Sequence, residues 1–214
     1  METKYITFQA YKGGVGKSTL AMIIATHLFQ EGKKVLVVDT DFQTSIYSLR
    51  LAEIKEAETE GQKIPVGFDV EPFVSSHPDT FRNYLMQKDG KYDYIIIDTP
   101  GATGEGEKEF LVALSHLIII PIIASKLDLE STMKFLVGVN DVLGEKKVPL
   151  IGIVNKEDNT KEQTEVLDLN GFQNLKLLKG SLKYLVRYRR EASTFEPMND
   201  DATKQIITEL KPYL

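Results

Sequence analysis

The sequence predicts an α/β fold in which a doubly wound, mostly parallel sheet is flanked by helices. Short runs of consecutive apolar residues recur along the chain, and such runs are typical of strands that are buried on both faces. Stretches with apolar residues at helical spacing separate these runs and provide the right-handed crossovers between parallel strands. Acidic residues follow several of the runs, at the strand ends where ligands bind in this class of sheet.

The expected elements alternate from the first strand to the last helix. Apolar runs predict strands at residues 5–8, 35–38, 94–97, 117–122 and 150–154, with a shorter strand at 66–70 after a charged, solvated stretch. Helical spacing predicts helices between residue 20 and Gly32, where glycine stops the helix, and at residues 46–57, 79–88, 105–115 and 128–143. A final helix carries the apolar stripe Ile206, Ile207, Leu210 and Leu214. We expect this stripe to pack on the sheet, because a helix that lies on a membrane is richer in Lys and Arg.

Composition excludes several classes of function. The chain has 214 residues and no cysteine, which excludes disulfides, thiolate metal sites, iron–sulfur ligation and a cysteine nucleophile. The three histidines, His27, His77 and His116, are expected to be structural or solvated rather than metal ligands. The sequence has neither a run of about 18 apolar residues nor a secretory signal. We therefore expect one cytoplasmic domain over residues 1–214, with no membrane partner.

A glycine-rich loop joins the first predicted strand to the first predicted helix. Its glycines, Gly13, Gly14 and Gly16, let the backbone turn tightly and bring N–H groups against phosphate oxygens at the positive end of the following helix. Lys17 is placed to contact the β- and γ-phosphates, and the Ser18 hydroxyl to bind Mg²⁺. The loop thus predicts a P-loop NTPase. Its expected nucleotide-binding residues are Lys12, Gly13, Gly14, Val15, Gly16, Lys17, Ser18 and Thr19.

The start of this loop departs from the general phosphate-loop pattern. That pattern has a glycine where this chain has Tyr11, and Lys12 follows it. With this lysine, Lys-Gly-Gly-Val-Gly-Lys-Ser-Thr resembles the deviant Walker A motif of the ParA/MinD family of partition and positioning ATPases. The resemblance implies that the chain forms a homodimer on binding ATP and that Lys12 reaches across the interface to the nucleotide of the partner subunit.

Two further stretches resemble the same family, so the resemblance spans essentially the whole chain. Residues 37–43, Val-Val-Asp-Thr-Asp-Phe-Gln, are similar to its D-x-D-x-Q box, which implies that Asp41 orients the attacking water and Asp39 supports the metal. Residues 95–98 form a Walker B pattern, an apolar strand that delivers Asp98 toward Mg²⁺. Asp39 and Asp41 could instead only cap the next helix. The expected catalytic residues are Lys12, Lys17 and Asp41, and the expected metal-binding residues are Ser18, Asp39 and Asp98.

The strand ends leave two choices of nucleotide. Residues 155–158, Asn-Lys-Glu-Asp, fit the N-K-x-D guanine signature of GTPases, and residues 98–101, Asp-Thr-Pro-Gly, fit their D-x-x-G pattern. Such short patterns arise easily by chance, and the family that the chain resembles uses ATP and often places an asparagine against adenine here. We therefore expect ATP and Mg²⁺ as cofactors, with Asn155 near the base, and keep GTP as the alternative.

A run of basic residues near the C-terminus contrasts with the acidic chain. The formal net charge of −5 argues against a generally basic nucleic-acid binder, but residues 171–190 contain no Asp or Glu. Their positive charge could neutralise DNA phosphates without reading sequence, as the resemblance implies, or could form an ordinary solvated face. The candidate DNA-binding residues are Lys176, Lys179, Lys183, Arg187, Arg189 and Arg190.

These features together predict a small ParA-like partition ATPase. The resemblance implies an ATP-bound homodimer that binds DNA nonspecifically on the nucleoid and is released after hydrolysis, which a ParB-type centromere-binding protein stimulates. Two alternatives stay open: an ATP-dependent ligase of dethiobiotin-synthetase type, and a MinD-like ATPase that positions a cargo other than DNA.

Overall fold

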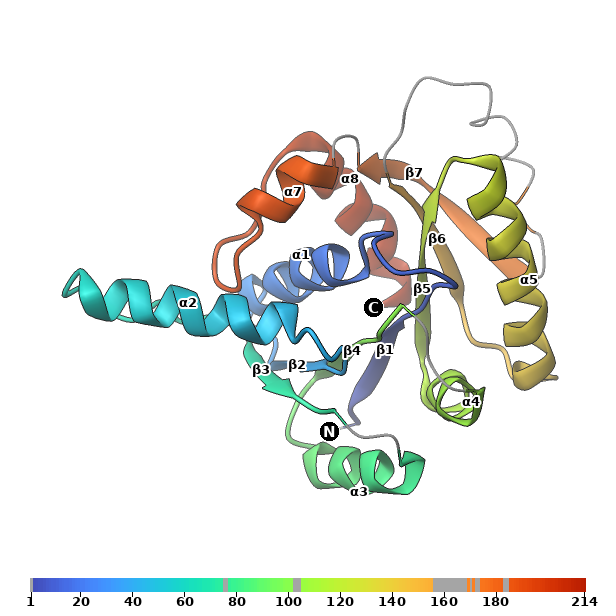
Figure 1. Cartoon of the computed structure of the whole chain (residues 1–214), viewed down its shortest axis with the longest axis horizontal. Coiled ribbons are helices and arrows are strands. Elements are labelled where there is room, and N and C mark those ends of the chain that lie inside the picture. The colour runs from blue at the N-terminus through green and yellow to red at the C-terminus, as the bar shows by residue number, and fades with distance from the viewer. Residues whose placement is uncertain are drawn as a thin grey trace.

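Figure 1 shows the computed structural model, which describes residues 2–74, 77–101, 105–155, 169, 171, 174–182 and 185–214. The strands are β1 (Lys4–Phe8), β2 (Val35–Asp39), β3 (Asp69–Pro72), β4 (Tyr94–Asp98), β5 (Leu117–Ile123), β6 (Leu150–Asn155) and β7 (Leu175–Leu182). The helices are α1 (Lys17–Gln30), α2 (Ser45–Thr59), α3 (Pro78–Lys88), α4 (Glu105–Leu114), α5 (Lys126–Leu143), α7 (Leu185–Glu191) and α8 (Asp201–Leu210), followed by the 3₁₀ turn η2 (Lys211–Tyr213). β7 and α7 are additions that the sequence pattern does not predict.

Within the described ranges, the strands form one seven-stranded sheet in the order β3-β2-β4-β1-β5-β6-β7. Each neighbouring pair runs parallel. β1 lies in the middle, with β2 to β4 on one side and β5 to β7 on the other. The strand order therefore reverses at β1. In sheets of this class, a ligand-binding crevice opens at the carboxyl ends of the strands where the order reverses. The predicted doubly wound α/β class is therefore confirmed.

Helices cover both faces of this sheet (Figure 1). α1, α7 and α8 lie on one face, α3, α4 and α5 on the other, and α2 extends away from the body of the molecule. In β4, Ile96 packs in the core on the side of α1 and α8, whereas Ile95 and Ile97 pack toward α3 and α4. This alternation explains why the strand appears in the sequence as an unbroken apolar run. None of the helices in the described part of the chain combines the length and the apolar character that a membrane span requires.

The shorter strand β3 begins later than the sequence pattern predicts. It covers Asp69–Pro72 rather than residues 66–70. At Gly67 the backbone instead packs against the segment after α7, so closely that a Cβ there would collide with the carbonyl oxygen of Thr194. Only beyond this contact does the chain pair with β2.

The register of the sheet brings polar strand ends together at one edge. Asp39 at the end of β2 lies opposite Asp98 at the end of β4, and Phe8 at the end of β1 also pairs with Asp98. Asn155 ends β6 at the same edge. The glycine-rich loop follows β1 and therefore lies among these residues, as the sequence predicts.

Candidate nucleotide-binding site

The glycine-rich loop has the backbone geometry that its sequence requires. Gly14 has φ 74° and Gly16 has φ 102°, in the left-handed region that side chains other than glycine rarely adopt. α1 begins directly after the loop, at Lys17. Its first turn therefore directs unpaired backbone N–H groups toward the loop, an arrangement that binds phosphate.

A cavity of about 630 Å³ opens at this loop. Four segments line it: the loop with the start of α1, the residues after β2, the residues after β4, and α7. From these segments come Gly13, Gly14, Gly16, Lys17, Ser18, Thr19, Met22, Asp41, Gln43, Ser45, Leu49, Thr99, Gly101 and Arg189. Its size suits a nucleotide, and its lining joins the predicted phosphate-binding loop to the predicted catalytic carboxylate.

Lys17 is buried, and among the described residues its ammonium group has no acidic hydrogen-bond partner. Its side chain is 6% exposed, and its Nζ lies 3.4 Å from the carbonyl oxygen of Lys12. Burial lowers the pKa of Lys17, while the nearby carboxylates of Asp98 and Asp41 act against this shift. A phosphate in the cavity would supply the strong acceptor that this ammonium group lacks.

Asp98 is a buried carboxylate without a satisfying partner. It is 1% exposed, and neither of its oxygens accepts a well-formed hydrogen bond within the described residues. Burial raises the pKa of Asp98 to about 7, although the neighbouring Ser18 hydroxyl and Lys17 act in the opposite direction. A divalent cation beside Asp98 and Ser18 would compensate this buried charge, so the donor set fits Mg²⁺.

Asp39 uses one of its two carboxylate oxygens to cap a helix at the end of β2. Its Oδ2 accepts hydrogen bonds from the backbone N–H groups of Ile46 and Tyr47, at 2.9 and 3.2 Å, and so caps α2. Its Oδ1 is buried and has no partner in the described part of the chain, and burial raises the pKa of Asp39. Helix capping therefore does occur, and the second oxygen has no partner among the described residues in a position opposite Asp98 in the sheet, so a role near the metal stays a prediction. No group of three or more His, Cys, Asp or Glu among the described residues forms a metal cage, and Mg²⁺ with nucleotide needs only one or two carboxylates.

The segment after β4 packs against the glycine-rich loop. A Cβ added to Gly101 would lie 2.5 Å from the Cα of Gly13, so the two backbones touch. The Thr99 hydroxyl donates to the carbonyl oxygen of Phe8 at 2.6 Å and fixes this segment to β1. In the sequence, Gly101 stands out only as the glycine of the D-x-x-G pattern, which does not indicate a contact with the loop. That pattern was the one sequence feature that could have marked Gly101 as a site residue.

Lys12 and Asn155 each make a contact within the chain that the sequence did not predict. Lys12 forms an ion pair with Asp128 of α5, with 2.8 Å between Nζ and Oδ1. Its side chain is thus directed toward α5 and not into the cavity beside Lys17. Asn155 is fully buried and donates from Nδ2 to the carbonyl oxygen of Val15 at 2.7 Å, so it fixes the glycine-rich loop to the end of β6. Its contact with the base stays a prediction, and Asp128 is a site residue that sequence analysis missed.

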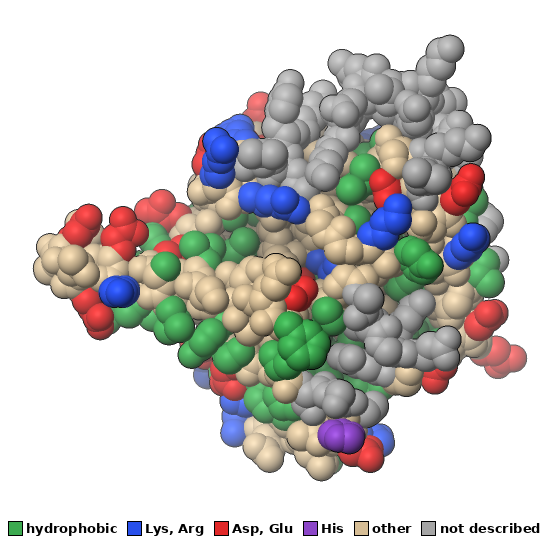
Figure 2. All heavy atoms as spheres, viewed as in Figure 1, with side chains coloured by type: hydrophobic (Ala, Val, Ile, Leu, Met, Phe, Trp, Pro, Cys, Tyr) green, Lys and Arg blue, Asp and Glu red, His purple; other side chains and the backbone are tan. Residues whose placement is uncertain are grey.

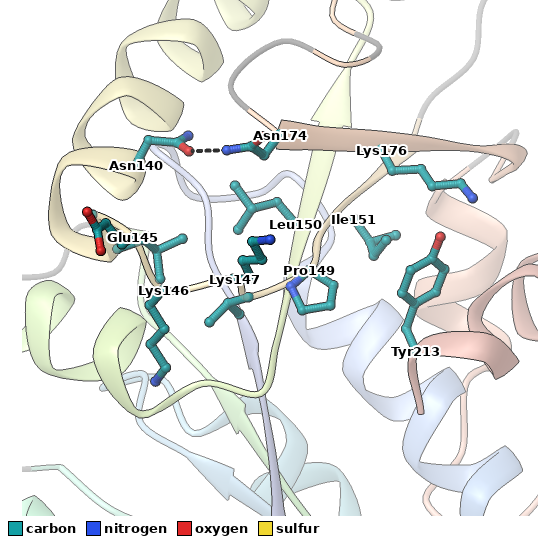
Figure 3. A pocket seen from close by; sticks show the side chains of 13 residues that line it. Asn140, Glu145, Lys146, Lys147, Pro149, Leu150, Ile151, Asn174, Lys176 and Tyr213 are labelled. Atoms are coloured by element: carbon teal, nitrogen blue, oxygen red, sulfur yellow. Dashed lines mark hydrogen bonds between the residues drawn. The ribbon is translucent and has the colours of Figure 1, made fainter.

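Those basic residues near the C-terminus that the structure describes do not form one cluster. Lys176 lies at the start of β7, with its Nζ 5.3 Å from the centre of the Tyr213 ring, beside a second cavity of about 810 Å³ (Figure 3). This larger cavity is at the amino ends of β6 and β7, far from the predicted chemistry. On α7, over which Figure 2 shows Lys and Arg side chains, Arg187 pairs with Glu191 at 2.9 Å and Arg189 contacts the loop. Lys179 and Arg190 are exposed, and Lys183 lies outside the described residues.

A phosphate-binding loop between a strand and a helix, with two buried carboxylates at the neighbouring strand ends, defines a P-loop nucleotide-binding domain. The family described as the CobQ/CobB/MinD/ParA nucleotide binding domain matches residues 6–198. The chain therefore belongs to this family, which confirms the resemblance inferred from its motifs.

Three similar proteins illustrate the relationship. The chain is 29% identical to an ATP-binding protein of Methanocaldococcus jannaschii, over 75% of this chain and 66% of that protein. It is 28% identical to a virulence plasmid ParA family protein of Chlamydia muridarum, over 63% of this chain and 62% of that protein. The matches therefore span just under two thirds of these relatives. The solved structure of a plasmid partition protein of Borrelia burgdorferi, bound to AMPPNP, is similar over 99% of both chains, with a TM-score of 0.70 and 24% identity.

Proposed function

We propose that this chain is an ATPase for DNA segregation. In this proposal an ATP-bound sandwich dimer binds DNA nonspecifically on the nucleoid in the cytoplasm, and a ParB-type partner stimulates hydrolysis and release. The observation that carries the proposal is Lys12, a second lysine in the phosphate loop that is directed away from the cavity of its own chain. The names of the partition relatives support the choice of DNA as cargo.

The exposed apolar side chains beside the cavity support self-association through this edge. Tyr11, next to Lys12, is 57% exposed, and Phe42, next to Asp41, is 82% exposed. Large aromatic side chains with this exposure are favourable at a protein interface and unfavourable in water. A dimer that joins the two loop edges would cover both and would bring each Lys12 toward the cavity of the other subunit.

The side chains around the cavity have the chemistry that the proposed ATP hydrolysis requires. The loop N–H groups and Lys17 hold the phosphates, and Asp41, half-buried at the cavity wall, positions a water by accepting its hydrogen bond. When bound by Ser18 and Asp98 with support from Asp39, Mg²⁺ neutralises phosphate charge. Loss of the γ-phosphate removes the group that Lys12 contacts across the interface, so the ADP state favours monomers.

Sedimentation with nucleotide tests the dimer. We expect wild-type protein to sediment as a dimer with ATP and Mg²⁺ and as a monomer with ADP. Lys12→Ala should bind ATP but remain monomeric, and Asp41→Ala should stay in the ATP-bound dimer. Lys55→Ala, which removes an exposed lysine of α2, is the control and should behave as wild type. If Lys12→Ala dimerises and hydrolyses ATP normally, the sandwich proposal is wrong.

Nucleotide selection needs a separate measurement. Titrating the wild-type protein with ATP and GTP, each with Mg²⁺, distinguishes the adenine and guanine alternatives. We expect tighter binding of ATP. Preference for GTP would instead support the N-K-x-D interpretation of residues 155–158.

DNA binding is tested with charge-neutralising variants that leave the cavity intact. Lys179→Gln combined with Arg190→Gln should weaken binding of the ATP-bound protein to random-sequence DNA and reduce the dependence of affinity on salt. Lys55→Gln with Lys63→Gln, which changes the net charge equally at another surface, should not. We leave Arg189 unchanged because it contacts the phosphate loop. If the first pair leaves affinity unchanged, the basic residues do not bind DNA.

The same assays separate the alternatives. An ATP-dependent dimer that does not bind DNA would support a positioning ATPase with another cargo. A protein that turns over ATP only when a small organic substrate is added would support a ligase. Both outcomes would overturn DNA segregation while leaving nucleotide binding intact.

A further inference from the structure

Arg189 connects α7 to the phosphate loop. Its Nη2 donates to the carbonyl oxygen of Gly14 at 3.0 Å, and its side chain forms part of the cavity wall together with Lys17 and Ser18. The other two arginines of the helix are placed differently, since Arg187 pairs with Glu191 and Arg190 does not line the cavity. Arg189 therefore belongs spatially to the nucleotide site.

The hydrogen bond from Arg189 orients a peptide group of the loop. A trans peptide group is planar, so holding the Gly14 carbonyl toward α7 directs the Val15 N–H the opposite way. The glycines on either side permit many backbone conformations, and without an external contact this peptide could rotate. Asn155 holds the next carbonyl, that of Val15, at 2.7 Å. Two consecutive peptide groups of the loop are thus fixed by side chains from distant elements.

The remaining donors of Arg189 suit a phosphate. A guanidinium group carries five N–H donors in a rigid fork, and the bond to Gly14 uses one of them. Such a fork binds phosphate oxygens in pairs and keeps its charge at any physiological pH. Arg189 would add a permanent positive charge to the cavity wall that Lys17 also lines.

We propose that Arg189 is a nucleotide-binding residue that acts within its own chain, contacting the phosphates of the bound nucleotide while it fixes the Gly14–Val15 peptide. This inference rests on the proposed nucleotide binding and assigns α7 a direct part in it. It also reassigns a residue that the sequence grouped with the DNA-binding candidates.

Titration of fluorescent ATP and ADP, with Mg²⁺ and without DNA, tests the inference. Arg189→Ala should weaken binding of both nucleotides by roughly tenfold or more, the effect of losing charge-assisted hydrogen bonds. Arg189→Lys keeps the charge but not the fork, and should recover part of the affinity. Arg190→Ala removes the neighbouring arginine of the same helix, and should bind within about twofold of wild type.

The outcomes separate this inference from the proposed function. If wild type binds ATP, Lys17→Ala does not, and Arg189→Ala binds as wild type does, the inference is wrong and the proposed function stands. If wild type binds neither ATP nor GTP, the proposed function itself fails. Thermal melting checks folding. If Arg189→Ala does not fold, Arg189→Lys decides, because unchanged affinity in that variant contradicts the role of the fork.

Discussion

Asp39 and Asp98 bury more negative charge than the side chains around them satisfy. Three of their four carboxyl oxygens have no hydrogen-bond partner among the described residues, and burial raises the pKa of both groups. Burying a carboxylate without a partner is unfavourable. Residues that make folding less favourable yet lie beside a cavity, as Asp98 lies beside the cavity residues Ser18 and Thr99, are typical of sites at which stability is given up for binding.

Replacing Asp98 tests whether this carboxylate lowers folding stability while it serves metal binding. Asp98→Asn removes a buried charge at nearly constant size, so we expect the free energy of unfolding, measured in urea without Mg²⁺ or nucleotide, to stay equal or rise by about 1 kcal/mol. ATP hydrolysis should fall by roughly a hundredfold or more, because a metal-binding carboxylate is lost. A variant that is clearly less stable than wild type would show that Asp98 is satisfied in the folded protein.

The contact between Gly101 and Gly13 gives a second prediction at this scale. A methyl group on Gly101 would displace the phosphate loop, and we expect Gly101→Ala to weaken ATP binding about tenfold, since overpacking costs roughly 1–3 kcal/mol. Gly106→Ala is the matched control, because its Cβ would meet nothing within 4 Å on α4 and should bind ATP as wild type does. Equal affinities of the two variants in a titration would contradict the proposed rigidity of the contact.

Motifs within one segment could be predicted from the sequence, and contacts between segments could not. The glycines and Lys17 follow one another in a contiguous loop, and in the structure they line one cavity. Asp128 and Arg189 reach the loop from positions 116 and 175 residues away from their partners Lys12 and Gly14. Nothing in the local spacing of a charged residue indicates such a contact.

At the scale of elements, α8 begins at a side-chain cap. Asp200 accepts hydrogen bonds on Oδ1 from the backbone N–H groups of Ala202 and Thr203, both at 3.1 Å, and from the Tyr188 hydroxyl at 3.0 Å. Burial favours the neutral carboxyl, but these hydrogen bonds outweigh it and hold the pKa of Asp200 below its ordinary value. The cap thus joins α7 to α8.

The lowered pKa sets the pH range in which this cap stabilises the fold. A carboxyl whose pKa is lower in the folded state stabilises above its unfolded pKa and loses this effect as the pH falls through the folded pKa. We expect Asp200→Ala to lower the free energy of unfolding by about 1–2 kcal/mol at pH 7, and by less below about pH 4. Asp201→Ala, one residue along, should lower it by only a few tenths of a kcal/mol. Urea denaturation across this pH range measures both. A deficit that does not depend on pH would contradict the role of the charge.

β7 shows why one element escaped prediction. Its residues Lys176 and Lys179 are exposed on an edge strand, and the charge pattern indicated a basic surface rather than a strand. Lysines on edge strands also prevent pairing with other chains. The central strands, in contrast, are buried on both faces, and their apolar runs predicted them well.

For the whole molecule, the order of strands and helices in the sequence was sufficient to predict the class of fold. Right-handed crossovers and parallel pairing leave few arrangements once the alternation is known. The relative position of the second cavity, near Lys176 and Tyr213, could not be predicted, because it depends on how the end of α5 and the C-terminal turn meet the amino ends of β6 and β7 (Figure 3).

In the proposed dimerisation, the equilibrium between monomer and dimer depends on which carboxylate or phosphate Lys12 contacts. In the structure Lys12 pairs with Asp128, and it would have to leave this ion pair to reach a nucleotide in the other subunit of the proposed dimer. The two side chains are 43% and 21% exposed, so the ion pair lies in the range in which breaking it costs up to about 1 kcal/mol. The ion pair is therefore expected to disfavour the proposed dimer by a small amount.

Asp128→Asn removes the negative charge that pairs with Lys12. It keeps a side-chain oxygen that can accept the hydrogen bond from the Ser125 hydroxyl. We expect the dissociation constant of the ATP-bound dimer, measured by sedimentation, to fall about two- to fivefold, which corresponds to the weak ion pair that is lost. Glu130→Gln, an exposed carboxylate on the same helix, is the control and should leave it unchanged. Adding Lys12→Ala to Asp128→Asn should abolish the dimer, as Lys12→Ala alone should, because the released lysine is what strengthens the dimer. If Asp128→Asn dimerises no better than Glu130→Gln, Lys12 does not have to leave Asp128, and its route to the second subunit must be different.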